Sequence, residues 1–175
     1  YLNGSNSEVI VGEDSFVNAR QGVSGIFSAA AGAHIVNRGL VEGSSYGIQG
    51  AIWSDVENYG TIRGVDGISH DGDGSQIYNY GAVEATQYGI KSNAGGTYIE
   101  NGKTGEISGD LQAIFIEGPG TAEIVNRGIL RGGAVAIEGE SSELSVKNTG
   151  KIVGDVILGA GTDIFDSRKG TLDGR

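Results

Sequence analysis

A five-residue phrase that recurs along the chain constrains its fold more than any other feature. The phrase begins with an apolar residue, has asparagine third and ends with glycine, as in Ile77-Tyr-Asn79-Tyr-Gly81. Its asparagines are Asn37, Asn58, Asn79, Asn126 and Asn148, and a looser copy with two extra residues contributes Asn101. In chain order these asparagines are 21, 21, 22, 25 and 22 residues apart. Such a near-constant period is typical of stacked units, each of which buries its apolar residues against its neighbours.

Each repeat carries three apolar positions separated by polar or small residues. In the repeat of Asn79 they are Ile77, Val83 and Ile90, the last in a Gly-Ile pair. The local alternation has a period of two, as in half-buried strands, and no stretch has sustained helical spacing. The sequence therefore predicts an all-β fold, a right-handed parallel β-helix (β-solenoid) of about eight coils of 21–25 residues.

The repeated polar positions have a structural explanation. Asparagine tolerates a left-handed backbone, and its side chain bonds nearby backbone groups. At a coil corner we expect the six asparagines to stack as a ladder, each bonding the next. We expect Gly81 and its equivalents to lie where the chain turns and a Cβ atom would clash.

The repeat boundaries predict one β-helix domain over residues 1–175. Residues 1–30 form a degenerate first coil, and residues 158–175 form the last coil, with Asp166 in the asparagine position. The chain contains no methionine. We therefore expect it to be a piece of a longer protein, whose flanking domains adjoin the solenoid ends.

The charge balance restricts the classes of partner. The chain carries 22 acidic and 12 basic residues, a net charge of −10, and no cysteine. Binding to DNA, RNA or anionic membranes needs clustered Lys and Arg, so these partners are disfavoured. No apolar stretch has the length for direct membrane insertion. The lack of cysteine excludes disulfides and thiol chemistry.

Two segments rich in glycine and aspartate are candidate calcium sites. Asp163 and Asp166 lie in the last coil, and Asp71 and Asp73 share the Asp-x-Asp-Gly bend that ends at Gly74. Calcium prefers such oxygen ligands on tight turns. The alternatives are a glycine-rich bend that closes the last coil and a solvated polar turn.

A catalytic interpretation has three candidate residues, which are His70, Asp71 and Asp73. Paired carboxylates act as acid and base in glycan-cleaving enzymes, and Glu84 or Lys91 of the next coil would lie nearby. However, the chain has only two histidines, and no dense carboxylate block recurs at the period. These features favour a non-catalytic protein.

Tyrosines at repeated positions predict a binding strip. Tyr59 and Tyr80 directly follow the asparagine in consecutive repeats, and Tyr46 and Tyr88 precede the Gly-Ile pair two repeats apart. Such rings could stack on sugars because they combine a large contact area with a polar edge. The alternative is that they stabilise neighbouring strands across the coils.

The repeating phrases resemble the β-helical repeat regions of large secreted bacterial proteins, namely autotransporter passengers and the solenoid parts of RTX-type exported proteins. The segment from Gly159 to Phe165 resembles half of the calcium-binding nonapeptide of RTX proteins. This resemblance implies a secreted or bacterial cell-surface location and calcium ordering of the C-terminal end.

The expected function is that of a non-catalytic rigid spacer or adhesion module that contacts a glycan or another cell-surface ligand. Two alternatives stay open. One is a polysaccharide-modifying module, such as a lyase, epimerase or hydrolase. The other is a fragment of a trimeric fibre, in which three such rods pack side by side.

Overall fold

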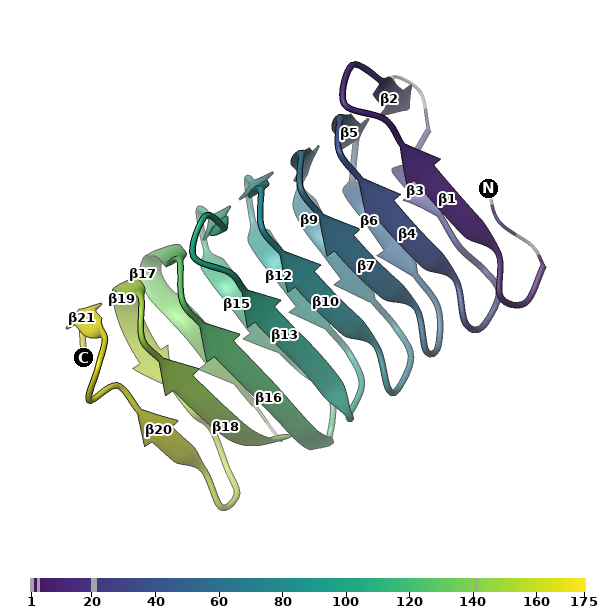
Figure 1. Cartoon of the computed structure of the whole chain (residues 1–175). Helices are drawn as coiled ribbons and strands as arrows, with labels where there is room; N and C mark the ends of the chain where they lie inside the picture. The colour runs from purple at the N-terminus through teal and green to yellow at the C-terminus, as the bar shows by residue number, and fades with distance from the viewer. Residues whose placement is uncertain (1, 3, 20–21, 141) are drawn as a thin grey trace.

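The computed structural model describes residues 2, 4–19, 22–140 and 142–175, and these wind into a parallel β-helix (Figure 1). All the strand pairs are parallel, and each strand pairs with its equivalents in the coils before and after it. Within the described residues there are strands only, so no helix is long and apolar enough to cross a membrane.

Three faces run along the rod. Face 1 consists of β1 (Glu8–Val11), β4 (His34–Asn37), β7 (Asp55–Asn58), β10 (Gln76–Asn79), β13 (Thr97–Asn101), β16 (Gly120–Asn126), β18 (Ser142–Asn148) and β20 (Ile164–Asp166). Face 2 consists of β2 (Phe16–Ala19), β5 (Leu40–Gly43), β8 (Thr61–Gly64), β11 (Ala82–Ala85), β14 (Glu106–Gly109), the first parts of β17 (Ile129–Gly139) and β19 (Lys151–Ile157), and β21 (Thr171–Asp173). Face 3 consists of β3 (Ser24–Phe27), β6 (Tyr46–Gly50), β9 (Asp66–His70), β12 (Tyr88–Ser92), β15 (Gln112–Ile116) and the later parts of β17 and β19.

The predicted coil number agrees closely with the structure. The described strands form seven coils that have all three faces, and β20 and β21 begin an eighth. In the sixth and seventh coils, β17 and β19 continue from face 2 into face 3, so these two faces join into one sheet. The predicted coil of three strands is thus visible directly in the strand order.

The core is a set of apolar ladders inside the three faces. In register on face 1, Ile77 lies between Val56 and Ile99, and all three are fully buried. Val83 on face 2 and Ile90 on face 3 are fully buried in the same coil. Burying one such side chain contributes about 1.5–3 kcal/mol, so the repeated apolar positions supply the main driving force for stacking.

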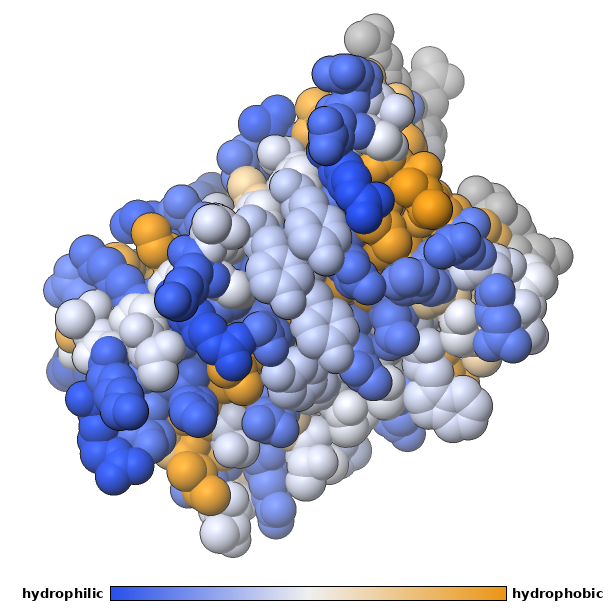
Figure 2. All heavy atoms as spheres, viewed as in Figure 1, coloured by the Kyte–Doolittle hydropathy of each residue, from blue (hydrophilic) through white to orange (hydrophobic). Residues whose placement is uncertain are grey.

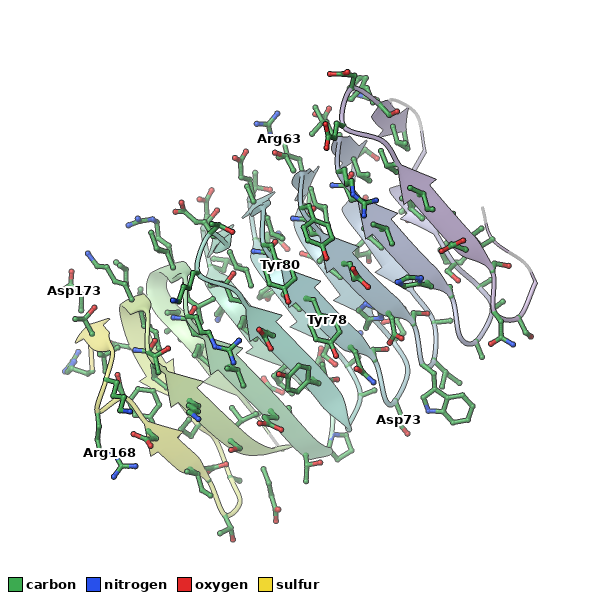
Figure 3. The ribbon with its side chains drawn as sticks, in the orientation of Figure 1. Arg63, Asp73, Tyr78, Tyr80, Arg168 and Asp173 are labelled. Atoms are coloured by element: carbon green, nitrogen blue, oxygen red, sulfur yellow. The ribbon has the colours of Figure 1, made fainter. Side chains whose placement is uncertain are left out.

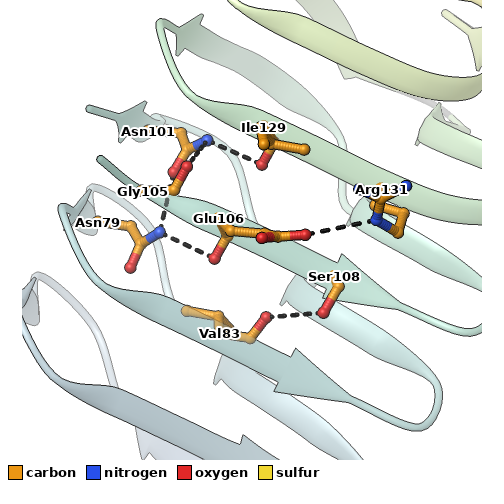
Figure 4. Close-up of polar contacts among 8 residues, drawn as sticks. All are labelled: Asn79, Val83, Asn101, Gly105, Glu106, Ser108, Ile129 and Arg131. Atoms are coloured by element: carbon orange, nitrogen blue, oxygen red, sulfur yellow. Dashed lines mark hydrogen bonds and ion pairs between the residues drawn. The ribbon is translucent and has the colours of Figure 1, made fainter. Parts of the chain in front are cut away.

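The predicted asparagine ladder forms at the corner between faces 1 and 2 (Figure 4). The Nδ2 atom of Asn79 donates to Asn101 Oδ1 at 2.9 Å and to the carbonyl oxygen of Glu106 at 3.2 Å. Asn58 Nδ2 in turn donates to Asn79 Oδ1 at 2.7 Å. The ladder residues are Asn37, Asn58, Asn79, Asn101, Asn126 and Asn148, all at most 1% exposed.

The reason why asparagine recurs at the ladder position differs from the predicted one. Among the described non-glycine residues, only Asn6 and Trp53 have a positive φ, so the ladder asparagines are not left-handed. Their side-chain bonds between coils are therefore the reason for the repeat. Gly81 is required by close packing, because a Cβ there would lie 2.1 Å from the carbonyl oxygen of Gly60.

The last coil has a register that differs from the prediction by one residue. Val146 pairs with Phe165 and Lys147 pairs with Asp166, so Ser167 follows in the asparagine position. Asn148 Nδ2 donates to Ser167 Oγ at 2.8 Å and ends the ladder there. A one-residue shift moves every side chain to the opposite side of a strand. Accordingly Phe165 packs on the core, while Ile164 is 61% exposed.

Candidate functional site

The outer side of face 1 carries a cluster of aromatic side chains. Figure 2 shows it as a pale group in the middle of this face, bordered by blue hydrophilic residues, and Figure 3 shows Tyr78 on β10 and Tyr80 just after that strand. Four tyrosines make up the cluster, which we call the tyrosine patch: Tyr59, Tyr78, Tyr80 and Tyr98. Their strands β7, β10 and β13 are neighbours, so the coil repeat itself brings the rings together.

Tyr59 and Tyr80 form a stacked pair. Their ring centroids are 5.2 Å apart at an angle of 14°. The Arg38 guanidinium lies 5.4 Å from the Tyr59 ring centroid, and Gly102 lies so close to Tyr80 that an added Cβ would be 2.4 Å from its Cδ1. The broad faces of this pair are thus largely covered by the protein, which favours a role in holding coils together over stacking on sugars.

Tyr78 and Tyr98 form a second pair, and both rings are half-buried. Their centroids are 5.7 Å apart, and the rings are tilted by 51°. Tyr98 donates its hydroxyl hydrogen bond to Glu100 Oε2 at 2.9 Å. Partial burial, and then this hydrogen bond, raise the pKa of Tyr98 to about 12. Tyr98 therefore stays neutral, and its ring is held in one orientation.

Sequence reasoning did not single out Tyr98. In register, Tyr98 pairs with Gln76 and Tyr78 pairs with Glu100, so the two rings meet on a diagonal. Diagonal neighbours on adjacent strands are within reach of aromatic side chains. A comparison of repeats that also considered positions two residues apart would have found this pair.

Charged groups surround the tyrosine patch. Glu57 accepts hydrogen bonds from Tyr59 at 2.9 Å and lies 3.2 Å from His34 Nε2. These contacts lower the pKa of Glu57, with the Tyr59 hydrogen bond as the main cause. Glu100 forms an ion pair with Arg127. Most carboxylates next to the patch are therefore already engaged by protein groups.

The other two predicted tyrosines lie on a different face. Tyr46 and Tyr88 are on face 3, and Asp66 lies in register beside Tyr46. Tyr88 stacks on Phe115 at 5.1 Å, and Lys91 Nζ lies 5.5 Å from the Tyr88 ring centroid. The four tyrosines predicted as one strip thus belong to two separate surfaces.

His70 lies in the core, at the corner between faces 3 and 1. Its side chain is 0% exposed, and neither ring nitrogen has a hydrogen-bond partner of ordinary geometry. Burial lowers the pKa of His70 to about 4, against smaller opposing effects of the Ala51 backbone and Asp71. In this structure the imidazole is sealed away from any dissolved substrate.

Asp71 and Asp73 lie in the turn after β9, on the surface (Figure 3 for Asp73). Asp71 accepts from Asn93 Nδ2 at 2.7 Å, and Asp73 accepts from the backbone nitrogen of Gly95 at 3.1 Å. Both carboxylates therefore bridge to the next coil. The three residues predicted as a catalytic group have one member in the core and two in a surface turn.

The C-terminal aspartates are also bonded by protein groups: Asp163 bridges to the preceding coil, and Asp166 pairs within its own coil. Asp163 Oδ1 accepts from the backbone nitrogen of Leu144 at 2.8 Å, and Asp166 pairs with Arg168 at 2.7 Å. The Arg168 hydrogen bonds hold the pKa of Asp166 well below its usual range. Among the described residues, no group of three or more acidic, histidine or cysteine side chains is placed to hold a metal ion. Calcium binding by Asp163, Asp166, Asp71 and Asp73 stays a prediction.

A hollow of about 410 Å³ opens on face 1 beside the tyrosine patch. Its floor includes Tyr98, Glu123, Ser145 and Ile164, which occupy one in-register row on β13, β16, β18 and β20. Thr121, Glu143 and Thr162 add polar groups to its wall. An aromatic ring, an exposed isoleucine and several hydroxyl and carboxylate groups therefore share one concave surface.

No protein-family model, no curated protein and no solved structure matches this chain.

Proposed function

We propose that this chain is a non-catalytic, secreted or cell-surface β-solenoid that serves as a rigid spacer and presents an adhesive surface. The observation that carries this proposal is the unbroken asparagine ladder. Its side-chain bonds from Asn37 to Asn148 are 2.7–2.9 Å long and lie inside the rod.

The ladder supports stiffness because its bonds link the second coil to the eighth, where they end at Ser167. Bending the rod at one coil would stretch a buried hydrogen bond whose partners have no water to replace it. Contacts on the outside of the rod also join neighbouring coils and stiffen it. Tyr59 stacks on Tyr80, and Arg63 Nε lies 2.8 Å from Glu84 Oε2, each across a coil boundary.

Face 1 supports the adhesive part of the proposal. The tyrosine patch and the adjoining hollow combine aromatic area with polar groups, as surfaces that bind glycans or proteins commonly do. The partner is then a glycan or another cell-surface ligand. The finer assignment to an RTX-type exported protein or an autotransporter passenger follows from sequence resemblance alone, and calcium ordering of the C-terminal end belongs with the first of these.

A bead assay tests the proposal. Beads that carry the protein, attached through a terminal tag, are expected to be retained on glycan-coated or cell-coated surfaces. Incubation with the same polysaccharides should release no products over time. Retention equal to that of uncoated beads would remove the adhesive role, and steady product release would replace it with the enzymatic alternative.

A calcium titration tests the C-terminal part separately. Stabilisation by calcium should appear as a rise in Tm that a chelator reverses. A melting curve unaffected by both would remove calcium from the proposal and leave the spacer role intact.

A further inference from the structure

We infer that the hollow on face 1 binds a neutral saccharide, with the Tyr98 ring as its stacking platform. The inference rests on the proposed adhesive function, since it names the chemical class of ligand and the place where it binds. The residues that line the hollow lie on or next to β13, β16, β18 and β20. Figure 1 shows these strands in the C-terminal half of the rod.

The shape of the hollow comes from one small residue in an outward row. Ser145 lies in register between Glu123 and Ile164. Its short side chain leaves a gap between them, and Tyr98 lies one coil beyond Glu123. The row thus places an aromatic ring at one end and an isoleucine that is 61% exposed at the other. A sugar also has apolar C–H faces and polar edges, which fit such a surface.

Tyr98 is the one ring of the tyrosine patch that lines the hollow. The Tyr78 ring contacts the Tyr98 ring at a tilt, and the Tyr98 hydroxyl donates to Glu100. The residue in register on the side away from Tyr78 is Glu123, so no second ring stacks there. A ring that is already fixed loses little conformational entropy when a ligand stacks on it.

The polar groups of the hollow differ from those around the rest of the patch. Glu57 and Glu100 are engaged by tyrosine, histidine or arginine side chains. By contrast, Thr121, Glu123, Glu143, Ser145 and Thr162 are exposed, and no side-chain hydrogen bond joins them to other described residues. Carboxylates are strong acceptors for hydroxyl donors, so Glu123 and Glu143 suit the hydroxyl groups of a sugar.

The charge of the hollow selects the kind of saccharide. Its described lining contains two carboxylates and no lysine, arginine or histidine. The chain as a whole has a net charge of −10. Glycans that carry carboxylate or sulfate groups would be repelled, whereas neutral glycans would lose no charge pairing on binding. Two carboxylates also fall short of the six to eight oxygen ligands that calcium takes.

The test is an NMR titration of the ¹⁵N-labelled chain with neutral hexasaccharides of glucose, mannose and galactose, and with hexagalacturonate as the acidic counterpart. At least one neutral sugar should shift the amide signals of Tyr98, Glu123, Ser145 and Ile164, with a Kd of about 1 mM or tighter. Hexagalacturonate should shift none of them. Absence of shifts with every neutral sugar, shifts on another face, or equal binding of hexagalacturonate would overturn the inference.

Variants locate the site. Tyr98→Ala should weaken binding about tenfold, which corresponds to the loss of about 1.4 kcal/mol of aromatic contact. Tyr98→Phe retains the ring and should stay within about threefold of the parent. Ser145→Trp fills the hollow from an exposed position and should abolish binding while the far-ultraviolet circular dichroism spectrum is unchanged. Tyr46→Ala removes a ring from face 3 and is the matched control. Unchanged affinity in Ser145→Trp would contradict the inference.

The outcomes separate this inference from the proposed function. Beads that still adhere after Ser145→Trp would leave the adhesive role intact and place it elsewhere on the rod. Beads of the parent that fail to adhere, together with neutral-sugar shifts in the hollow, would support a saccharide site without an adhesive role.

Discussion

Two corners of the same coil are built in opposite ways. At the corner between faces 1 and 2, six consecutive coils place asparagine, and each side chain bonds the next. At the corner between faces 3 and 1, the in-register residues are Gly50, His70, Ser92, Ile116 and Gly139. Neither ring nitrogen of His70 there has a hydrogen-bond partner of ordinary geometry among the described residues.

The difference between the two corners shows why one position holds the same residue in successive coils and the other does not. An asparagine amide both donates and accepts, so an identical neighbour completes its bonding in each direction. At the other corner isoleucine and glycine fill space, and the Ser92 hydroxyl bonds Ala94 and Thr97 a few residues further along the chain. Repetition is therefore expected where a side-chain bond passes from coil to coil, and variety where packing and local bonds decide.

Breaking the asparagine ladder should have the largest effect. Asn79→Leu removes bonds to Asn58, Asn101 and Glu106 and leaves their buried polar atoms unpaired. We expect the free energy of unfolding to fall by about 3 kcal/mol, measured by urea denaturation. Asn93→Leu is the control: it removes a bond to Asp71 at an exposed position, where water can replace the lost partner, and it should cost about 0.5 kcal/mol or less. Equal stability of the two variants would show that the ladder bonds contribute little.

Lowering the pH should destabilise the protein through His70, at the corner between faces 3 and 1. The folded pKa of His70 is about 4 and its unfolded value is 6.5, so the unfolded chain takes up the proton first. Stability from this residue is complete above pH 6.5, is lost as the pH falls toward 4, and changes no further below that. Between pH 7 and pH 5 the loss should be about 2 kcal/mol.

His70→Leu isolates this contribution, because it replaces the ring by an apolar side chain that cannot bind a proton. The variant should lose about 2 kcal/mol less than the parent over the same pH range. A parallel pH dependence of the two proteins would mean that His70 finds a partner or water in solution.

Removing the stacked pair of Tyr59 and Tyr80, outside the asparagine corner, should lower stability by a smaller amount. Replacing Tyr59 and Tyr80 together by serine removes their stacking and the Arg38 contact. We expect a loss of about 1.5 kcal/mol, seen as a lower Tm, with saccharide binding in the hollow unchanged. Tyr46→Ser is the control, since Tyr46 has no ring partner among the described residues. Loss of binding in the double variant would instead make these rings part of the site.

The exposed ion pairs should contribute least. Arg63 and Glu84 are 46% and 48% exposed, and they form a cross-coil pair on face 2. Glu84→Gln should lower stability by about 0.3 kcal/mol, and salt should reduce that difference. A loss above about 1 kcal/mol would mean that surface charge, in addition to the ladder, fixes the coil spacing.

The repeated residues made most of the fold predictable. The Asn spacing and the Ile and Val positions placed the three strands of each coil, because each of these residues has one structural role. The last coil was predicted one residue out of register, since Asp166 looks like Asn while the actual ladder position holds Ser167. Only the pairing of Phe165 with Val146 reveals the shift.

The candidate site was harder to predict because it depends on neighbours in three dimensions. Tyr59 and Tyr80 share a repeat position and were found together. Tyr98 meets Tyr78 on a diagonal, and the hollow exists because Ser145 is small, which no motif records. His70 appeared as a candidate acid or base by residue type, and its complete burial became visible only with the packed coils.

The most direct test of the asparagine ladder is hydrogen exchange of the side-chain amide groups, followed by NMR. The Nδ2 protons of Asn58, Asn79, Asn101 and Asn126 should exchange as slowly as the buried backbone amides beside them, because each donates inside the rod. The exposed Asn93 should exchange rapidly. If the ladder amides exchanged as fast as Asn93, the continuous ladder, and with it the account of the rigid rod, would be contradicted.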